Sequence, residues 1–116
     1  MIDIKTELYN YILANGSVSY AAIEHFFEEN NYSYKGDILS ASNVDPNVVF
    51  WHGWNTKAFN LLTELVRENK VSRDPTTPLI YFIDGKFCTF PIVKNLPEIG
   101  YKSPHWLPCV FSAVIK

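Results

Sequence analysis

The strongest structural signal in the sequence is a set of apolar residues that repeats at helical spacing after residue 55. Positions i, i+3, i+4, i+7 and i+8 of this set are Ala58, Leu61, Leu62, Leu65 and Val66. Such spacing places all of these side chains on one face of an amphipathic helix. Asn55 precedes the set and is a residue type that caps helix N-termini. Because an apolar helix face must be buried, the pattern predicts a globular domain packed around this helix.

Residues 2–16 predict an earlier helix. Asp3 is placed to act as its N-cap, and Gly16 is placed to end it in a left-handed conformation. Its apolar face consists of Ile4, Leu8, Tyr11 and Ile12.

Residues 17–31 predict another helix, which begins at Ser19. Val18 and Ile23 stand in the two positions of a hydrophobic staple, which fixes how the chain enters a helix. The residues expected in the core are Ile23, Phe26 and Phe27. The residues expected in solvent are Glu24, Glu28 and Glu29.

The rest of the chain is rich in strand and turn signals. Residues 31–47 contain the turn-forming pair Asp45-Pro46 and predict a loop, with at most one short strand or helical turn near residues 37–39. Asp84-Gly85 is a strong signal for a two-residue hairpin between strands at residues 79–83 and 86–90. Further strands are predicted at residues 48–51, followed by a turn at His52-Gly53, at residues 71–73 and at residues 109–115.

The order of these elements predicts the fold class. Two helices, a strand and a third helix are followed by a group of strands, and this order is typical of a winged-helix-like α+β domain. We expect three helices and a small antiparallel sheet with an extra C-terminal hairpin or strand. Residues 74–78, which include two prolines, correspond to the wing, and a single domain is expected over residues 1–116.

The composition is that of a folded protein, since 47% of the residues are apolar and 16% are aromatic. No apolar run approaches the ~18–20 residues of a membrane span, and the first residues lack the pattern of a secretory signal. We therefore expect a cytoplasmic protein with no membrane partner. Cys88 and Cys109 are expected to be buried apolar residues rather than disulfide partners or zinc ligands.

Three phrases of the sequence together resemble a known family. They are VVFWHGWN (residues 48–55), LIYFIDG (residues 79–85) and YKSPHWLP (residues 101–108). Over residues 48–108 the chain resembles a family of small proteins encoded by phages and staphylococcal pathogenicity islands. The resemblance implies an accessory protein of a mobile genetic element, and it carries no catalytic residue.

Charge is divided unevenly along the chain, whose formal net charge is −2. Residues 1–56 hold two basic and seven acidic residues, whereas residues 57–116 hold eight basic and five acidic residues, so the second half can form a local positive face.

Double-stranded DNA, bound by a dimer, is the leading predicted partner. Arg73 and Lys86 suit contacts with phosphates, whereas Glu64 and Glu68 oppose binding because they repel phosphates. Side chains on the polar side of the helix that follows Asn55 can read base edges, and these are Thr56, Lys57, Asn60, Thr63 and Arg67.

A protein partner or self-association is the alternative hypothesis, because winged-helix domains are often reused in this way. A basic partner surface would suit the acidic residues Glu24, Glu28, Glu29 and Asp37. Residues of a type found at interface hot spots, but more often in the core of a small domain, are Trp51, Trp54 and Trp106. Residues 101–106 could also stack on single-stranded nucleic acid, although a turn whose Trp106 fills the core is the favoured interpretation.

No catalytic signature is present, because the sequence lacks a glycine-rich phosphate loop, a nucleophile elbow and an HExxH zinc helix. We therefore predict a non-enzymatic protein with no cofactor, metal or small-molecule substrate. His25 lies on an acidic helix and is expected to be exposed. His52 and His105 each neighbour a tryptophan and could meet near Cys109, but structural roles are favoured over zinc binding.

Overall fold

The computed structural model describes residues 3–86, 88–94 and 100–114. It confirms the predicted α+β class, but the described residues form four helices and two sheets, one with a parallel pair, where three helices and one antiparallel sheet were expected. In chain order the elements are α1 (Ile4–Asn15), β1 (Ser17–Ser19), α2 (Tyr20–Glu29), β2 (Lys35–Ala41), β3 (Val48–Trp54), α3 (Thr56–Arg67), β4 (Val71–Pro75), α4 (Leu79–Asp84), β5 (His105–Trp106) and β6 (Cys109–Ala113).

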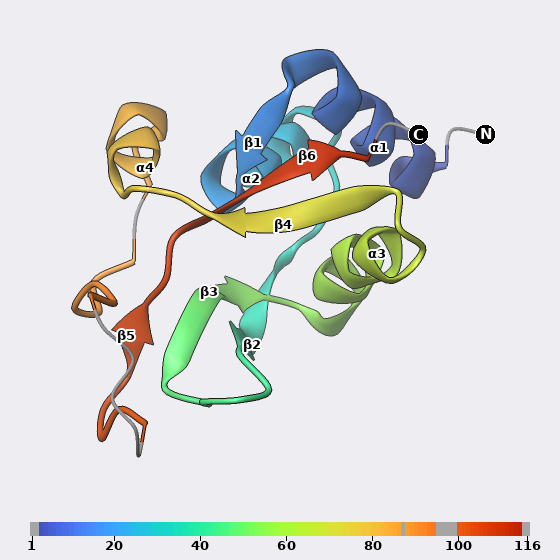
Figure 1. Cartoon of the computed structure of the whole chain (residues 1–116). Coiled ribbons are helices and arrows are strands. Elements are labelled where there is room, and N and C mark those ends of the chain that lie inside the picture. Colours follow the sequence, from blue (N-terminus) through green and yellow to red (C-terminus); the bar gives the residue numbers. More distant parts are fainter. Residues whose placement is uncertain (1–2, 87, 95–99, 115–116) are drawn as a thin grey trace.

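The strands form two separate three-stranded sheets. In the first sheet β6 lies between β1 and β4 and is antiparallel to both (Figure 1). In the second sheet β3 lies between β2, which is antiparallel to it, and β5, which is parallel to it. Figure 1 shows α3 and the β2–β3 pair below the first sheet, so that β4 faces both.

The three predicted helix N-termini are confirmed. The side chains of Asp3, Ser19 and Asn55 each accept a backbone N–H of the first helical turn, at 3.1, 3.0 and 2.8 Å. Gly16 ends α1 with a positive φ of 81°, but its ψ of −71° lies outside the left-handed helical region that we expected. The local cap signals therefore located all three helices correctly.

Asn55→Ala is expected to lower the free energy of unfolding by about 1–2 kcal/mol. Asn55 caps α3 through its Oδ1, which accepts from the Ala58 N–H, and its Nδ2 donates to the Ser33 carbonyl at 2.9 Å. Asn55→Asp keeps the capping acceptor and should retain most of the stability in a urea titration. An equal loss in both variants would assign the effect to the Ser33 contact instead of the cap.

The predicted hairpin at residues 79–90 is wrong, because residues 79–84 form the short helix α4. Gly85 has φ 82° and ψ 9° and ends this helix, so the same positive φ that suits a hairpin turn here suits a C-cap. Tyr81 anchors the helix, since its buried hydroxyl donates to the Cys109 carbonyl at 2.6 Å. Residues 86 and 88–90 are not in a strand, and residue 87 lies outside the described residues. The wing loop predicted at residues 74–78 begins two residues too early, because Asp74 and Pro75 still belong to β4.

The turn predicted at His52-Gly53 is also wrong. β3 continues to Trp54, and His52 pairs with Leu39 of β2. β2 itself occupies seven residues of the predicted loop. Its many polar residues and its irregular register with β3 hide the alternation by which a strand is usually found.

Aromatic residues fill one continuous core. Trp51, Trp54 and Trp106 are 5%, 0% and 1% exposed, which confirms the core interpretation and removes them from the candidate interface. Cys88 and Cys109 are both buried, as expected. Among the described residues, no helix has the length and apolar character that crossing a membrane requires.

Candidate functional site

The polar side of α3 is an exposed row of side chains without partners. Thr56, Asn60, Thr63 and Arg67 follow the spacing i, i+4, i+7 and i+11, so they form one stripe along the helix. Lys57 lies beside this stripe. Within the described part of the chain, none of these side chains makes a hydrogen bond or an ion pair, and all of them are exposed. Their donors are therefore available to a ligand.

The acidic residues of α3 are paired with a lysine of α1. Lys5 Nζ lies 3.3 Å from Glu64 Oε1 and 2.7 Å from Glu68 Oε2. The hydrogen bond with Glu68 raises the pKa of Lys5, and the same contact lowers the pKa of Glu68. The two carboxylates that were expected to repel phosphate are thus partly neutralised, and they lie toward α1 rather than on the stripe.

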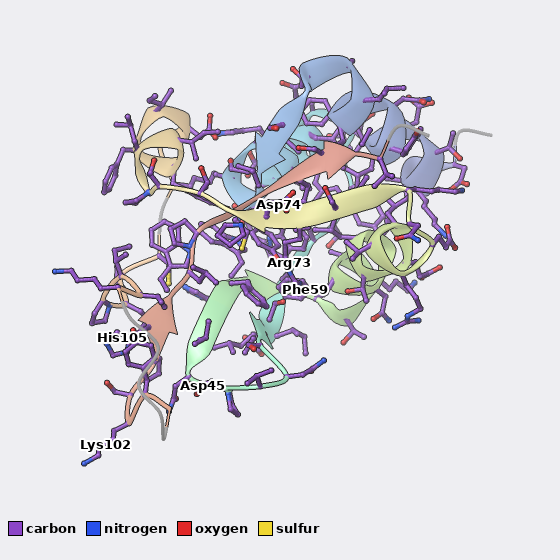
Figure 2. All side chains as sticks on the ribbon, viewed as in Figure 1. Asp45, Phe59, Arg73, Asp74, Lys102 and His105 are labelled. Atoms are coloured by element: carbon purple, nitrogen blue, oxygen red, sulfur yellow. The ribbon has the colours of Figure 1, made fainter. Side chains whose placement is uncertain are left out.

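Arg73 extends the positive surface from α3 to β4. Its guanidinium carbon lies 3.9 Å from the centroid of the Phe50 ring, which is a cation–π contact. Side chains alternate along a strand, so the neighbouring Ser72 and Asp74 point to the other face of β4, where the Ser72 hydroxyl donates to Asp74. Figure 2 shows Arg73 and Asp74 on opposite sides of the β4 ribbon. The carboxylate next to Arg73 in sequence is therefore directed away from it.

Arg67 and Arg73 line the same groove, which we call the α3–β2 groove. Its volume is about 330 Å³, and it lies between α3, β4 and the end of β2. Figure 2 shows Phe59 and Arg73 in this region. Its remaining lining residues are Tyr20, Ser40, Ala41, Asn43, Phe59, Leu62, Thr63, Val66 and Phe111, so no carboxylate of the described residues lines it.

Tyr20 forms part of the groove floor and remains protonated. Burial raises the pKa of its hydroxyl to about 12, although the positive charge of Arg73 and the Ser40 hydroxyl act in the opposite direction. Ser40 and Asn43 were missed by sequence reasoning, because nothing local to residues 31–47 indicates that this segment packs beside α3. The groove therefore presents two guanidinium groups and several neutral polar groups above an aromatic floor.

Lys86 does not join the other predicted site residues. Its Nζ lies 2.9 Å from Glu24 Oε1 and 2.9 Å from Glu28 Oε2, both on α2. Two hydrogen bonds lower the pKa of the Glu28 carboxyl to about 2. The one from the Tyr34 hydroxyl has the larger effect, and the one from Lys86 adds to it. The charge of Lys86 is therefore balanced within the protein and is not part of the α3 face.

Glu24 is buried, which corrects the expectation that it faces solvent. Only 9% of its surface is exposed, and its Oε2 accepts the indole N–H groups of Trp51 and Trp54 at 2.7 and 2.8 Å. A charged residue on an amphipathic helix gives no local sign of such partners, which come from β3. The acidic surface proposed for a basic partner is consequently reduced to Glu28, Glu29 and Asp37.

The histidines contact other groups instead of one another. The His105 ring stacks on Tyr101 with 3.8 Å between centroids, and the His52 ring lies 5.9 Å from that of Phe90. His25 is exposed, as expected. Burial raises the pKa of the Cys109 thiol to about 11. In residues 3–86, 88–94 and 100–114, no cluster of three or more His, Cys, Asp or Glu side chains has an arrangement suited to a metal ion.

Comparison of this chain with models of protein families, with curated proteins and with solved structures finds no match.

Proposed function

We propose that this protein binds double-stranded DNA through α3 and Arg73, and that its helices and first sheet form a winged helix. Support comes from the order α1, β1, α2, α3, β4 and β6, with β6 between β1 and β4. In such domains the third helix and the following hairpin usually meet nucleic acid. The β2–β3 pair would then be an insertion before α3, and residues 76–108 would take the place of the wing.

The observation that carries this proposal is the stripe of unpaired donors on α3, which continues into the groove beside Arg73. Asn60 has the side chain that reads adenine edges in a major groove, and Arg67 lies beside it on the stripe with a charge available for a phosphate. Lys57 and Arg73 have charges available for phosphates. Because the chain as a whole has a net charge of −2, affinity for DNA would depend on this one face.

Binding should be measured by fluorescence anisotropy with labelled duplex and single-stranded DNA at several salt concentrations. Each neutralised phosphate contributes about −0.9 to the slope of log K against log salt, so Lys57, Arg67 and Arg73 together predict a slope of about −3. Within the mobile-element family that residues 48–108 resemble, such a protein would act as a regulator or accessory factor.

The double variant Lys57→Glu with Arg67→Glu is expected to weaken duplex binding on the order of 100-fold without unfolding the domain, since both residues lie on the exposed side of α3. The matched control is Lys94→Glu with Lys102→Glu, which changes the net charge equally at exposed positions near β5. Figure 2 shows Lys102 far from Arg73. Equal weakening by both pairs would mean that net charge, and not the α3 face, controls binding.

A protein partner is the second candidate, and α4 favours it. Leu79, Phe82 and Ile83 are 62%, 56% and 75% exposed, which is unusual for three large apolar side chains on one short helix. If neither duplex nor single-stranded DNA binds at low salt, this function replaces the first. Leu79→Ser with Ile83→Ser would then be the variant to compare with the wild type in binding to a partner.

A further inference from the structure

The α3–β2 groove has the size of a site for one small planar group. Small-molecule sites usually have volumes of about 300–1,000 Å³, and this groove, at about 330 Å³, lies at the lower end. A duplex cannot enter a concavity of this size, whereas a single base that is not paired can. The groove therefore suits an unpaired base, whereas the exposed stripe of α3 suits a duplex.

Arg73 supplies a flat surface at the wall of the groove. Its guanidinium carbon lies over the Phe50 ring, 3.9 Å from the centroid, and Arg73 lines the groove whereas Phe50 does not. The guanidinium thus contacts the phenyl ring on one side and borders the groove on another. Guanidinium planes held in this way are surfaces on which unpaired nucleic-acid bases stack.

The other groups of the groove match the remaining parts of a nucleotide. Arg67 stands at the rim with no acidic partner among the described residues, where a phosphate could reach it. Asn43 and Thr63 have side chains without a partner among the described residues, and these can donate to and accept from the edge of a base. Within residues 3–86, 88–94 and 100–114, no carboxylate lines the groove to repel the phosphate.

We propose that the α3–β2 groove receives one unpaired base of the bound nucleic acid, with Arg73 stacked on the base and Arg67 at its phosphate. This inference rests on the proposed DNA-binding function and adds a preference to it. The protein binds a duplex more tightly when the duplex contains an unpaired nucleotide, because no base pair has to be opened to fill the groove.

The test uses three labelled duplexes of the same sequence, measured by fluorescence anisotropy. One is fully paired, one has a single extra nucleotide in its centre, and one has an abasic residue at that same extra position. The second duplex is expected to bind about tenfold more tightly than the first, because stacking of one base contributes that much or more. The abasic duplex has the same backbone and charge and should lose this gain.

Variants test whether the preference for an unpaired base comes from the groove. The quantity compared is the ratio of the affinities for the base-containing and the abasic duplex. Arg73→Lys keeps the charge but removes the flat guanidinium, so the ratio for the base-containing and abasic duplexes should fall toward one. Asn43→Ala, in an exposed turn, is a second groove variant and should also lower this ratio. Lys57 does not line the groove, so Lys57→Ala should weaken both complexes by the same factor and leave the ratio unchanged.

Two results would overturn the inference in distinguishable ways. If the wild type binds all three duplexes equally, the groove does not receive a base, although DNA binding itself stands. If none of the duplexes binds at low salt, the DNA-binding function and the groove assignment are both wrong. A ratio that stays high in folded Arg73→Lys and Asn43→Ala variants would likewise exclude the groove as the base site.

Discussion

Replacing Glu24 by alanine is expected to lower the free energy of unfolding by about 3 kcal/mol, a large part of the stability of a domain of this size. Its carboxylate receives the indole N–H groups of Trp51 and Trp54 and the ammonium group of Lys86. Removing it leaves two buried donors without an acceptor, and each unsatisfied buried donor costs about 1–3 kcal/mol. The change is measured by urea unfolding followed by circular dichroism and by tryptophan fluorescence.

Glu24→Gln is the matched control. Its amide oxygen can still accept from both indoles, but its amide nitrogen cannot pair with Lys86, so a smaller loss of about 1–2 kcal/mol is expected. Lys86→Met tests the ion pair from the other side and keeps the two indole hydrogen bonds. If Glu24→Ala unfolds at the same urea concentration as the wild type, the carboxylate does not hold these elements together.

The Glu24 network also supports the candidate site. It joins α2 to β3 and to the segment that follows α4, and no buried side-chain N or O atom in the described residues lacks a hydrogen-bond partner. Trp54 is followed directly by Asn55, the N-cap of α3. The position of Trp54 therefore helps to set where α3 begins, and loss of Glu24 should loosen the α3 face as well as the core.

Gly36→Ala is the second substitution with a large expected effect, a loss of about 2–3 kcal/mol. A Cβ atom at this position would lie 2.6 Å from Asn55 Cα and 2.8 Å from the Trp54 carbonyl oxygen. Both are backbone atoms, so the clash cannot be relieved by rotating a side chain, and β2 must move away from the start of α3. Urea unfolding measures the stability, and the anisotropy titration measures whether DNA affinity falls with it.

Asp37→Ala provides the comparison for Gly36→Ala. Asp37 is the next residue of β2 and is exposed, so its substitution should change the free energy of unfolding by no more than about 0.5 kcal/mol. Similar losses in the two variants would show that β2 responds to any substitution. In that case the close approach of Gly36 to the backbone of Asn55 would not be the cause.

Part of the candidate site could be predicted from the sequence. The stripe on α3 follows from helical spacing alone, because residues three and four apart must lie on one face. The sequence indicates that Glu64 and Glu68 repel phosphate, but it does not show that Lys5 pairs with both of them. Lys5 is more than fifty residues away in the chain. For the same reason Lys86 was assigned to phosphate, although Glu24 and Glu28 of α2 already bind it.

The elements that follow from the sequence alone are those whose signals lie within a few residues. These are the capped helices α1, α2 and α3 and the apolar strands at the start of β3 and in β4 and β6. The helix at residues 79–84 depends on contacts made after folding, because a short apolar run fits either a helix or a strand. The hydrogen bond from the Tyr81 hydroxyl to the Cys109 carbonyl favours the helix. The burial of Glu24 and the position of Arg67 and Arg73 in one groove also depend on the tertiary fold. Both require contacts between elements that are far apart in the chain.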